Sequence, residues 1–393
     1  MPVASPRSRH RRPEFLISCA TIALAAATLA PSRAMAQAFQ GVPATLNGTV
    51  SYARSTPGSE TVTIGSSTAT INWTPDSTQG TGNVNFLPSG NTATFQAAQG
   101  VTGFTVLNRV LPSTATQPIE LNGTVLGKLA DNTTGGNVWF YSPGGIIVGQ
   151  NAVIDVGGLL LSTIDLPGSF TTSASGFSAS FSKTQSTAGS IQIKPGAQIN
   201  ARSSYVGMVA PRIEQGGNVN VNGSAAYAAA DQLTMTLNQG MFDIAVPVGS
   251  GTSDANGIVH TGTTGGAANV GASDHHSIYM VAVPKNQALT MLLDGSLGFA
   301  PAAQGASVEN GHIVLRSGFG STSGSGAITI GSQGPASFSS SVTGQSDGPM
   351  LVKATSGDTA FSKDLSLTNA SALSGGITLL ANNGHQITVG GSA

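Results

Sequence analysis

Short apolar segments with two-residue alternation recur along almost the whole chain after residue 36. Aliphatic or aromatic residues alternate with polar ones in each of them, as at Val62/Ile64 and Ile146/Val148. Successive side chains of a β-strand point to opposite faces, so this alternation predicts strands that are buried on one side. Residues favoured in turns, chiefly glycine, asparagine and serine, separate the segments. Because no convincing amphipathic helix follows residue 36, the pattern predicts an all-β fold.

The spacing of these strands favours a coil over a sandwich or a barrel. Between residues 190 and 240 the expected linkers are two to ten residues long, and Ile199 and Val219 are 20 residues apart. A coil of parallel strands with about 20 residues per turn gives this spacing. The chain has only 14 Phe, 2 Trp and 5 Tyr, few for the core of a sandwich of this size. We therefore predict a β-solenoid, with another all-β architecture as the alternative. The strands expected in this window are residues 190–194, 197–201, 205–210, 218–222 and 233–237.

The first 36 residues have the three parts of a secretory signal. A basic start with four arginines is followed by an uncharged apolar stretch, residues 15–29. Ala34 and Ala36 then supply the small residues at positions −3 and −1, which predicts cleavage before Gln37. The apolar stretch is shorter than the roughly 20 residues that a membrane-spanning helix needs. An uncleaved membrane anchor is the alternative.

Few charges and a single cysteine limit the partners and the chemistry of the processed chain. Charged residues make up 8% of the sequence, against about 25% in ordinary globular domains. No basic stripe is present, so the sequence argues against nucleic acid as a partner. The one cysteine, Cys19, lies in the signal segment, so disulfides cannot hold the mature fold together. No second long apolar run follows, and we expect no further membrane span.

The sequence contains no recognisable catalytic, cofactor or metal centre. The cluster Asp274-His275-His276 has no third or fourth ligand at a suitable spacing, so we interpret it as an exposed polar loop. No Gly-x-Ser-x-Gly elbow accompanies the many serines. A β-helix groove could assemble two carboxylates for sugar cleavage, but no pairing is visible in the sequence. The carboxylates considered for that role are Asp155, Asp165, Glu214, Asp231 and Asp243.

A block at residues 136–163 resembles a known secretion domain. It reads Gly-Asn-Val-Trp-Phe-Tyr-Ser-Pro-Gly-Gly-Ile-Ile-Val-Gly over 136–149 and Asn-Ala-Val-Ile-Asp-Val-Gly-Gly-Leu-Leu-Leu-Ser-Thr over 151–163. This block is similar to the signature of the filamentous haemagglutinin N-terminal domain, the secretion domain of two-partner exoproteins. The resemblance covers about residues 38–240, with further matches at residues 84–86, 104–110, 119–125, 196–201 and 209–216.

This resemblance implies a fold, an export route and a set of partners. The implied fold is a right-handed parallel β-helix with an N-terminal cap and extra-helical hairpins. The general secretory translocon would deliver the chain to the periplasm of a Gram-negative bacterium. POTRA domains of an outer-membrane barrel transporter would then recognise it. The product would be a secreted or surface-exposed adhesin or haemagglutinin-like protein, with host-cell or matrix surfaces as further partners. A carbohydrate-active β-helix enzyme and an autotransporter passenger are the alternatives.

Turn residues and aromatic residues of the block are the candidates for transporter recognition. Residues 143–145, Pro-Gly-Gly, combine a fixed φ with a permissive one and so predict a tight turn. The glycines at 157–158 let the backbone turn where a side chain would clash. Side chains 139–141 alternate faces, so at least one should point outward, to pack under the cap or a hairpin or to contact the transporter. The full candidate set is Asn137, Trp139, Tyr141, Pro143, Gly144, Gly145, Ile146, Gly149, Asn151, Gly157 and Gly158.

These patterns divide the chain into three expected parts. They are a signal peptide at residues 1–36, a secretion β-helix domain at 37–250, and a continuing β-solenoid stem with loop excursions at 251–393. The segment 249–272 is rich in Gly, Ser, Thr and Ala, and we expect it to be a loop at the boundary. The chain stops without a charged or helical cap. Because an uncapped coil exposes strand edges, we expect a longer native array.

Overall fold

A computed structural model describes most of the chain beyond the predicted signal. The described residues are 1–2, 37–76, 82–166, 170–173, 176–184, 189–268, 275–300, 311–318, 325–369 and 376–393. Contacts divide the chain into Met1–Ala34 and Met35–Ala393, and the second unit is the one described below. The predicted signal core and its cleavage residues Ala34 and Ala36 lie outside the described residues, and Gln37 is the first residue after them.

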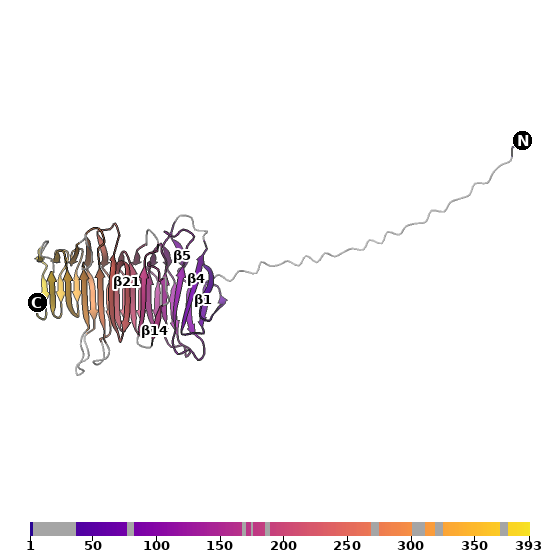
Figure 1. Cartoon of the computed structure of the whole chain (residues 1–393), viewed down its shortest axis with the longest axis horizontal. Helices are drawn as coiled ribbons and strands as arrows, with labels where there is room; N and C mark the ends of the chain where they lie inside the picture. The colour runs from indigo at the N-terminus through magenta and orange to yellow at the C-terminus, as the bar shows by residue number, and fades with distance from the viewer. Residues whose placement is uncertain are drawn as a thin grey trace. The chain divides into compact units, whose positions relative to one another are not determined.

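Strands build three long sheets that run side by side through the unit (Figure 1). We name them sheets A, B and C. Sheet A contains β1 (Gly41–Asn47), β4 (Thr68–Pro75), β7 (Thr105–Val110), β10 (Asn137–Tyr141), β13 (Gly158–Ser162), β18 (Tyr205–Ala210), β21 (Ser224–Asn238), β25 (Ser277–Ala282), β28 (His312–Ser317), β31 (Ser341–Ser346) and β34 (Leu365–Asn369).

Sheets B and C complete the coil. Sheet B contains β2 (Val50–Thr56), β3 (Ser59–Ile64), β6 (Thr92–Ala97), β9 (Thr124–Lys128), β12 (Val153–Val156), β17 (Gln198–Ala201), β20 (Asn218–Val221), β24 (Thr263–Gly266), β27 (Gly295–Phe299), β30 (Ala336–Phe338), β33 (Thr359–Phe361) and β36 (Ile387–Val389). Sheet C contains β5 (Val84–Leu87), β8 (Ile119–Leu121), β11 (Ile146–Val148), β16 (Ile191–Ile193), β19 (Ile213–Gln215), β23 (Asn256–His260), β26 (Leu289–Leu293), β29 (Gly326–Ile330), β32 (Met350–Ala354) and β35 (Ile377–Ala381).

Each turn of the coil adds one strand to sheet A, one to sheet C and one to sheet B. The chain passes from β10 to β11 and β12 and returns to sheet A as β13, where Asn137 pairs in parallel with Gly158, 21 residues later. The side-chain amide of Asn218 donates a hydrogen bond to the side chain of Gln198, which lies 20 residues earlier in the preceding turn of sheet B. The predicted all-β parallel β-helix of about 20 residues per turn is therefore confirmed.

The core is a stack of inward-facing aliphatic side chains. In sheet C, residues in parallel register place one isoleucine on another through five successive turns. All five are fully buried, and burying each contributes on the order of 2 kcal/mol. The two-residue alternation in the sequence thus corresponds to one buried face on every strand. The stacked residues are Ile119, Ile146, Ile191, Ile213 and Ile258.

A cap closes the N-terminal end of the coil. There β1 pairs antiparallel with β4, and β2 pairs antiparallel with β3, in contrast to the parallel turns that follow. Phe39 is fully buried beneath them, with its ring centroid 4.7 Å from that of Phe86 and 4.9 Å from that of Trp73. The predicted cap is confirmed, and its aromatic cluster covers the end of the aliphatic stack.

An antiparallel outer sheet covers part of sheet A. It contains β14 (Thr171–Ser173), β15 (Gly176–Ser182), the second half of β21 and β22 (Met241–Gly249). The first half of β21 belongs to the coil, and the strand then runs on past it. The predicted coil strand at residues 233–237 is therefore wrong, because its alternating apolar residues pack against the outer face of sheet A. The predicted extra-helical hairpins are present.

Two further expectations are corrected by the structure. The described part of the segment 249–272 is not a loop, because β23 and β24 lie within it and stack in register on β19 and β20, whereas residues 269–272 and Asp274 lie outside the described residues. The coil thus continues on both sides of residue 250. His276 is not in an exposed loop, because its side chain is buried at a corner of the coil and its Nδ1 lies 2.9 Å from the carbonyl oxygen of Ala267. No helix in the described part of the chain is long and apolar enough to cross a membrane.

One histidine lies inside the coil. His260 is fully buried, with Nδ1 placed 2.8 Å from the carbonyl oxygen of Asp294 and Nε2 placed 3.0 Å from Thr264 Oγ1. The Tyr227 hydroxyl lies 2.9 Å from the same Thr264 oxygen. A neutral ring that donates from Nδ1 and accepts at Nε2 satisfies all of these contacts. Burial lowers the pKa of His260 to about 4.

We predict that acid destabilises the coil through His260. Its pKa is about 4 when folded and about 6.5 when unfolded, so the unfolded chain takes up the proton first. The stabilisation is complete above pH 6.5 and is lost as the pH falls towards 4, by about 3 kcal/mol in the free energy of unfolding. Denaturant unfolding from pH 7.5 to pH 4 should show this loss in the native chain and a smaller one in His260→Gln. The exposed His312 supplies the control, since His312→Gln should keep the native profile.

Candidate functional site

The block 136–163 forms one complete turn of the coil. It contains β10, a corner at residues 142–145, β11, a second corner at 149–152, β12 and a third corner at Gly157, and it then enters β13. Parallel pairing connects β10 to β7 on one side and to β13 on the other. The most distinctive part of the sequence is therefore a single closed layer in the stack. We call it the signature turn.

The aromatic run of the signature turn is divided between two cores. Phe140 points into the coil, whereas Trp139 and Tyr141 point outward and lie under the outer sheet. Trp139 is 0% exposed, and its ring centroid lies 5.1 Å from that of Phe177 in β15. The packing of outward aromatics under an extra-helical hairpin, one of the two expectations, is thus what the folded chain shows. Contact with a transporter through these rings is not possible while the outer sheet covers them.

Polar contacts fix these outward aromatic residues. The Trp139 indole N–H donates to the Tyr205 hydroxyl over 2.7 Å, and burial raises the pKa of Tyr205. The Arg109 guanidinium lies 4.9 Å from the centre of the Tyr141 ring and forms two hydrogen bonds to the Asp165 carboxylate. Sequence reasoning missed Tyr205 as a partner of Trp139. The two are 66 residues apart, so only the register of the coil could have linked them.

The corner at residues 142–145 is close to the preceding turn of the coil. A Cβ atom on Gly144 would lie 2.1 Å from the backbone oxygen of Gln117, and Gly145 has φ +127°. The Gly145 N–H donates to the Ser142 carbonyl over 3.3 Å, and the Pro143 carbonyl accepts from Gly189 over 2.8 Å. The predicted tight Pro-Gly-Gly turn is present. Glycine is required at position 144 because the backbones of the two neighbouring turns are in contact there, which leaves no space for a side chain.

The other glycines of the signature turn also mark close approaches. A Cβ atom on Gly149 would lie 1.9 Å from Asn122 Oδ1, and one on Gly158 would lie 2.6 Å from Asn137 Oδ1. The candidate residues therefore lie in β10, β11 and β13 and at three different corners rather than at one shared site. Most of them are buried in the folded chain, and Asn151 is exposed. Their assignment to transporter recognition stays a prediction.

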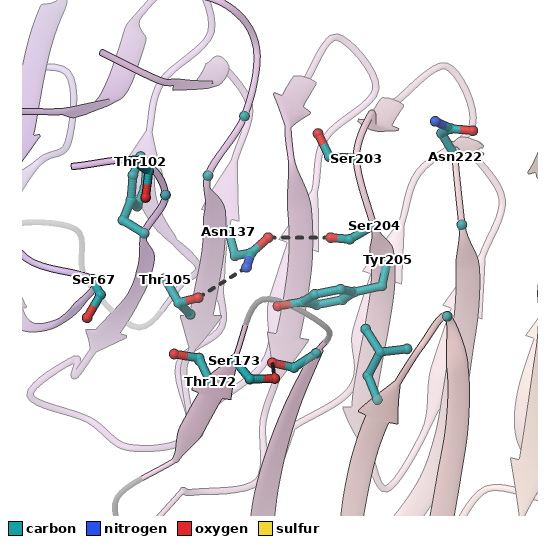
Figure 2. A pocket seen from close by; sticks show the side chains of 18 of the residues that line it. Ser67, Thr102, Thr105, Asn137, Thr172, Ser173, Ser203, Ser204, Tyr205 and Asn222 are labelled. Carbon is teal, nitrogen blue, oxygen red and sulfur yellow. Dashed lines mark hydrogen bonds between the residues drawn. The ribbon is translucent and has the colours of Figure 1, made fainter. Parts of the chain in front are cut away.

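A groove lies beside Asn137, where strands of sheet B turn into sheet A (Figure 2). We call it the corner groove, and its cavity volume is about 730 Å³. Asn137 Nδ2 donates to Thr105 Oγ1 over 3.1 Å, and Asn137 Oδ1 accepts from Ser204 over 3.4 Å. Figure 2 shows these three side chains in a row, with Thr172 and Ser173 of β14 nearby. Sequence reasoning identified Asn137 but not the groove.

Most of the carboxylates considered for catalysis contact cations. Asp155 pairs with Arg202, Asp165 with Arg109, and Glu214 with Arg212. Asp231 lies between two lysines, 3.4 Å from Lys183 Nζ and 3.5 Å from Lys285 Nζ, whereas Asp243 is exposed on β22. Their geometry is that of ion pairs that link turns or hairpins. Within the described residues, no group of three or more His, Cys, Asp or Glu side chains is placed to hold a metal.

Comparison with known proteins gives one family and two solved structures. A family model described as the TPS secretion domain matches residues 83–330, more than half of the chain. The crystal structure of a filamentous hemagglutinin secretion domain is 16% identical and aligns over 89% of this chain and 99% of that one, with a TM-score of 0.44. The HMW1 secretion domain from Haemophilus influenzae is 15% identical over 89% and 98%, with the same TM-score. No curated protein sequence matches significantly.

We predict that Gly144→Ala destabilises the signature turn. The added methyl group would meet a backbone oxygen that belongs to the neighbouring turn, so relief requires the two turns to separate. Overpacking of this kind costs about 1–3 kcal/mol, which urea unfolding of the mature chain would measure. Gly103→Ala is the matched control, because a Cβ atom there would have no heavy atom within 4 Å. Equal stability of the two variants would contradict the close approach.

Proposed function

The chain belongs to the TPS secretion domain family, and we propose that it directs an exoprotein through an outer-membrane barrel transporter. The supporting observation is that the family match at residues 83–330 coincides with an uninterrupted coil that includes the signature turn. The general secretory translocon would first deliver the chain to the periplasm, and the POTRA domains of the transporter would bind it there. The destination is the cell surface or the medium of a Gram-negative bacterium.

We further propose that the transporter recognises a chain that has not yet closed, and the burial pattern supports this. Trp139, Tyr141 and Ile146 are fully or almost fully buried in the folded coil, so they can contact a partner only before folding. An extended segment that contains them can add to the edge of a partner sheet through its main chain. Closure of each turn outside the cell then buries apolar surface and opposes backward movement, since each turn of a solenoid contacts mainly its neighbours.

The role after export is proposed as that of an adhesin or haemagglutinin-like protein, with host-cell or matrix surfaces as partners. The family is a secretion domain. Four of the five carboxylates considered for polysaccharide cleavage are held in ion pairs, which disfavours the rival of a carbohydrate-active enzyme. The other rival is an autotransporter passenger. It requires a barrel encoded in the same gene, so the neighbouring genes distinguish it from a two-partner system.

We predict that removal of the signature turn blocks export. Deleting residues 138–158 removes one whole turn and places Leu159 where Val138 had been, because these residues pair in register. In cells that carry the cognate transporter, this deletion should leave the chain in the periplasm, where proteases degrade it. Fractionation and immunoblotting of medium, surface and periplasm would measure the distribution.

A second whole-turn deletion supplies the control. Residues 342–364 lie outside the family match, and their removal places Leu365 in the position of Val342. This variant should be exported as the native chain is, and both should stay in the periplasm when the transporter gene is absent. Normal surface display of the 138–158 deletion would refute the role of the signature turn. Export of the native chain without the transporter would refute the proposed function itself.

A further inference from the structure

The corner groove has a lining that is polar but almost uncharged. Among the described lining residues there is no Asp, Glu, Lys or Arg, and apart from Tyr205 the one ionisable side chain is that of His275. Hydroxyl and amide groups come from the places where β4, β7, β10, β18 and β21 enter sheet A and from the outer sheet, whereas the entry into β13 contributes none. The exposed members of this set are Ser67, Thr102, Ser173, Ser203, Asn222 and Gln239.

These groups match a ligand that both donates and accepts hydrogen bonds. A serine or threonine hydroxyl donates one hydrogen bond and can accept others, and an amide side chain does both. Asn137 is held between Thr105 and Ser204, so its orientation is set before any ligand arrives. Spacing between neighbouring strands is about 4.8 Å, so the lining repeats polar groups along the coil axis. A chain of linked, hydroxyl-bearing units fits this repeat.

A peptide cannot add as an extra strand to the sheet A side of the groove. The backbone along this corner is already paired from turn to turn: Asn137 N–H donates to Phe104 O, and Ser204 N–H donates to Gly157 O. The Ser224 N–H donates in turn to Ser204 O over 3.2 Å. Sheet A therefore has no open edge along this corner for main-chain addition, and a ligand there must be recognised by side chains.

A charged ligand also fits poorly. A carboxylate or sulfate that entered the groove would lose water without gaining an oppositely charged partner from the described lining, and such a loss is costly. The volume of about 730 Å³ lies within the range of small-molecule and cofactor sites. Tyr205 lies at the wall of the groove beside the hydroxyl row (Figure 2), but it is only 2% exposed, so polar groups form most of the accessible lining.

From these observations we propose that the corner groove binds a neutral oligosaccharide along the coil axis. The hydroxyls of the sugar units exchange hydrogen bonds with the row that runs from Thr102 through Asn137 to Ser203 and Asn222. Thr172 and Ser173 of β14 border the same space from the outer sheet. This binding is separate from export, because it uses exposed groups of the folded coil.

The test measures binding of defined tetrasaccharides to the folded mature chain, residues 37–393. The neutral probes are cellotetraose, maltotetraose, mannotetraose and chitotetraose, and the anionic comparator is tetragalacturonate, each titrated by calorimetry. We expect at least one neutral probe to bind with a Kd of about 1 mM or tighter. Hydrogen exchange with that probe bound should show protection centred on residues 102–105 and 203–204.

Matched variants then assign the site. The double variant Ser203→Ala, Asn222→Ala removes two exposed polar groups and should weaken binding about tenfold or more. Asn220→Ala removes an equally exposed amide two residues away, outside the lining, and should bind as the native chain does. The proposal is overturned if all four neutral probes fail to bind or if tetragalacturonate binds as tightly. It is also overturned if Asn220→Ala weakens binding as much as the double variant.

Discussion

Register between successive turns is the constraint on which the rest of the structure depends. Between the cap and the last turn, each coil strand pairs in parallel with its counterparts one turn before and after it, so a residue such as Ile146 meets the same kind of side chain above and below. Shifting one strand by a single residue would reverse the side chains that point into the coil. The aliphatic stack and the backbone hydrogen bonds therefore favour the same alignment. This agreement explains how a chain with few charges and no cysteine beyond residue 19 can specify one fold.

The positions of several glycines follow from the same constraint on the spacing of turns. Turns of a coil lie about 4.8 Å apart, so a corner has room for side chains only where the neighbouring corner is small. Gly144 lies against the backbone of Gln117, and Gly149 lies against the side chain of Asn122. These glycines make room for the next turn, whereas the positive φ of Gly145 serves the local bend. Most glycines of the signature turn are thus explained by close contact between neighbouring turns.

The coil could be predicted from sequence because its two determinants are local. Alternation shows which face of a strand is buried, and the distance between equivalent residues gives the length of a turn. The partner of a buried face is not local information, which is why residues 233–237 seemed to be a further coil strand. Met235 alternates like a core residue, yet its partners lie on the outer face of sheet A. For the same reason the corner groove and the link from Trp139 to Tyr205 were not foreseen.

The outer sheet can form only after the turns of the coil that it covers have been supplied by the chain. Trp139 lies in the first half of the chain. Phe242, which helps to complete the cluster that covers it, lies 103 residues further along the chain. A chain that emerges with its N-terminus first can therefore complete the first turns of the coil before the outer sheet forms. Until then, the apolar outer face of sheet A is exposed to water. During that interval this face is open to chaperones, to other emerging chains and to proteases. The speed at which the next hundred or so residues arrive then decides how long this exposure lasts.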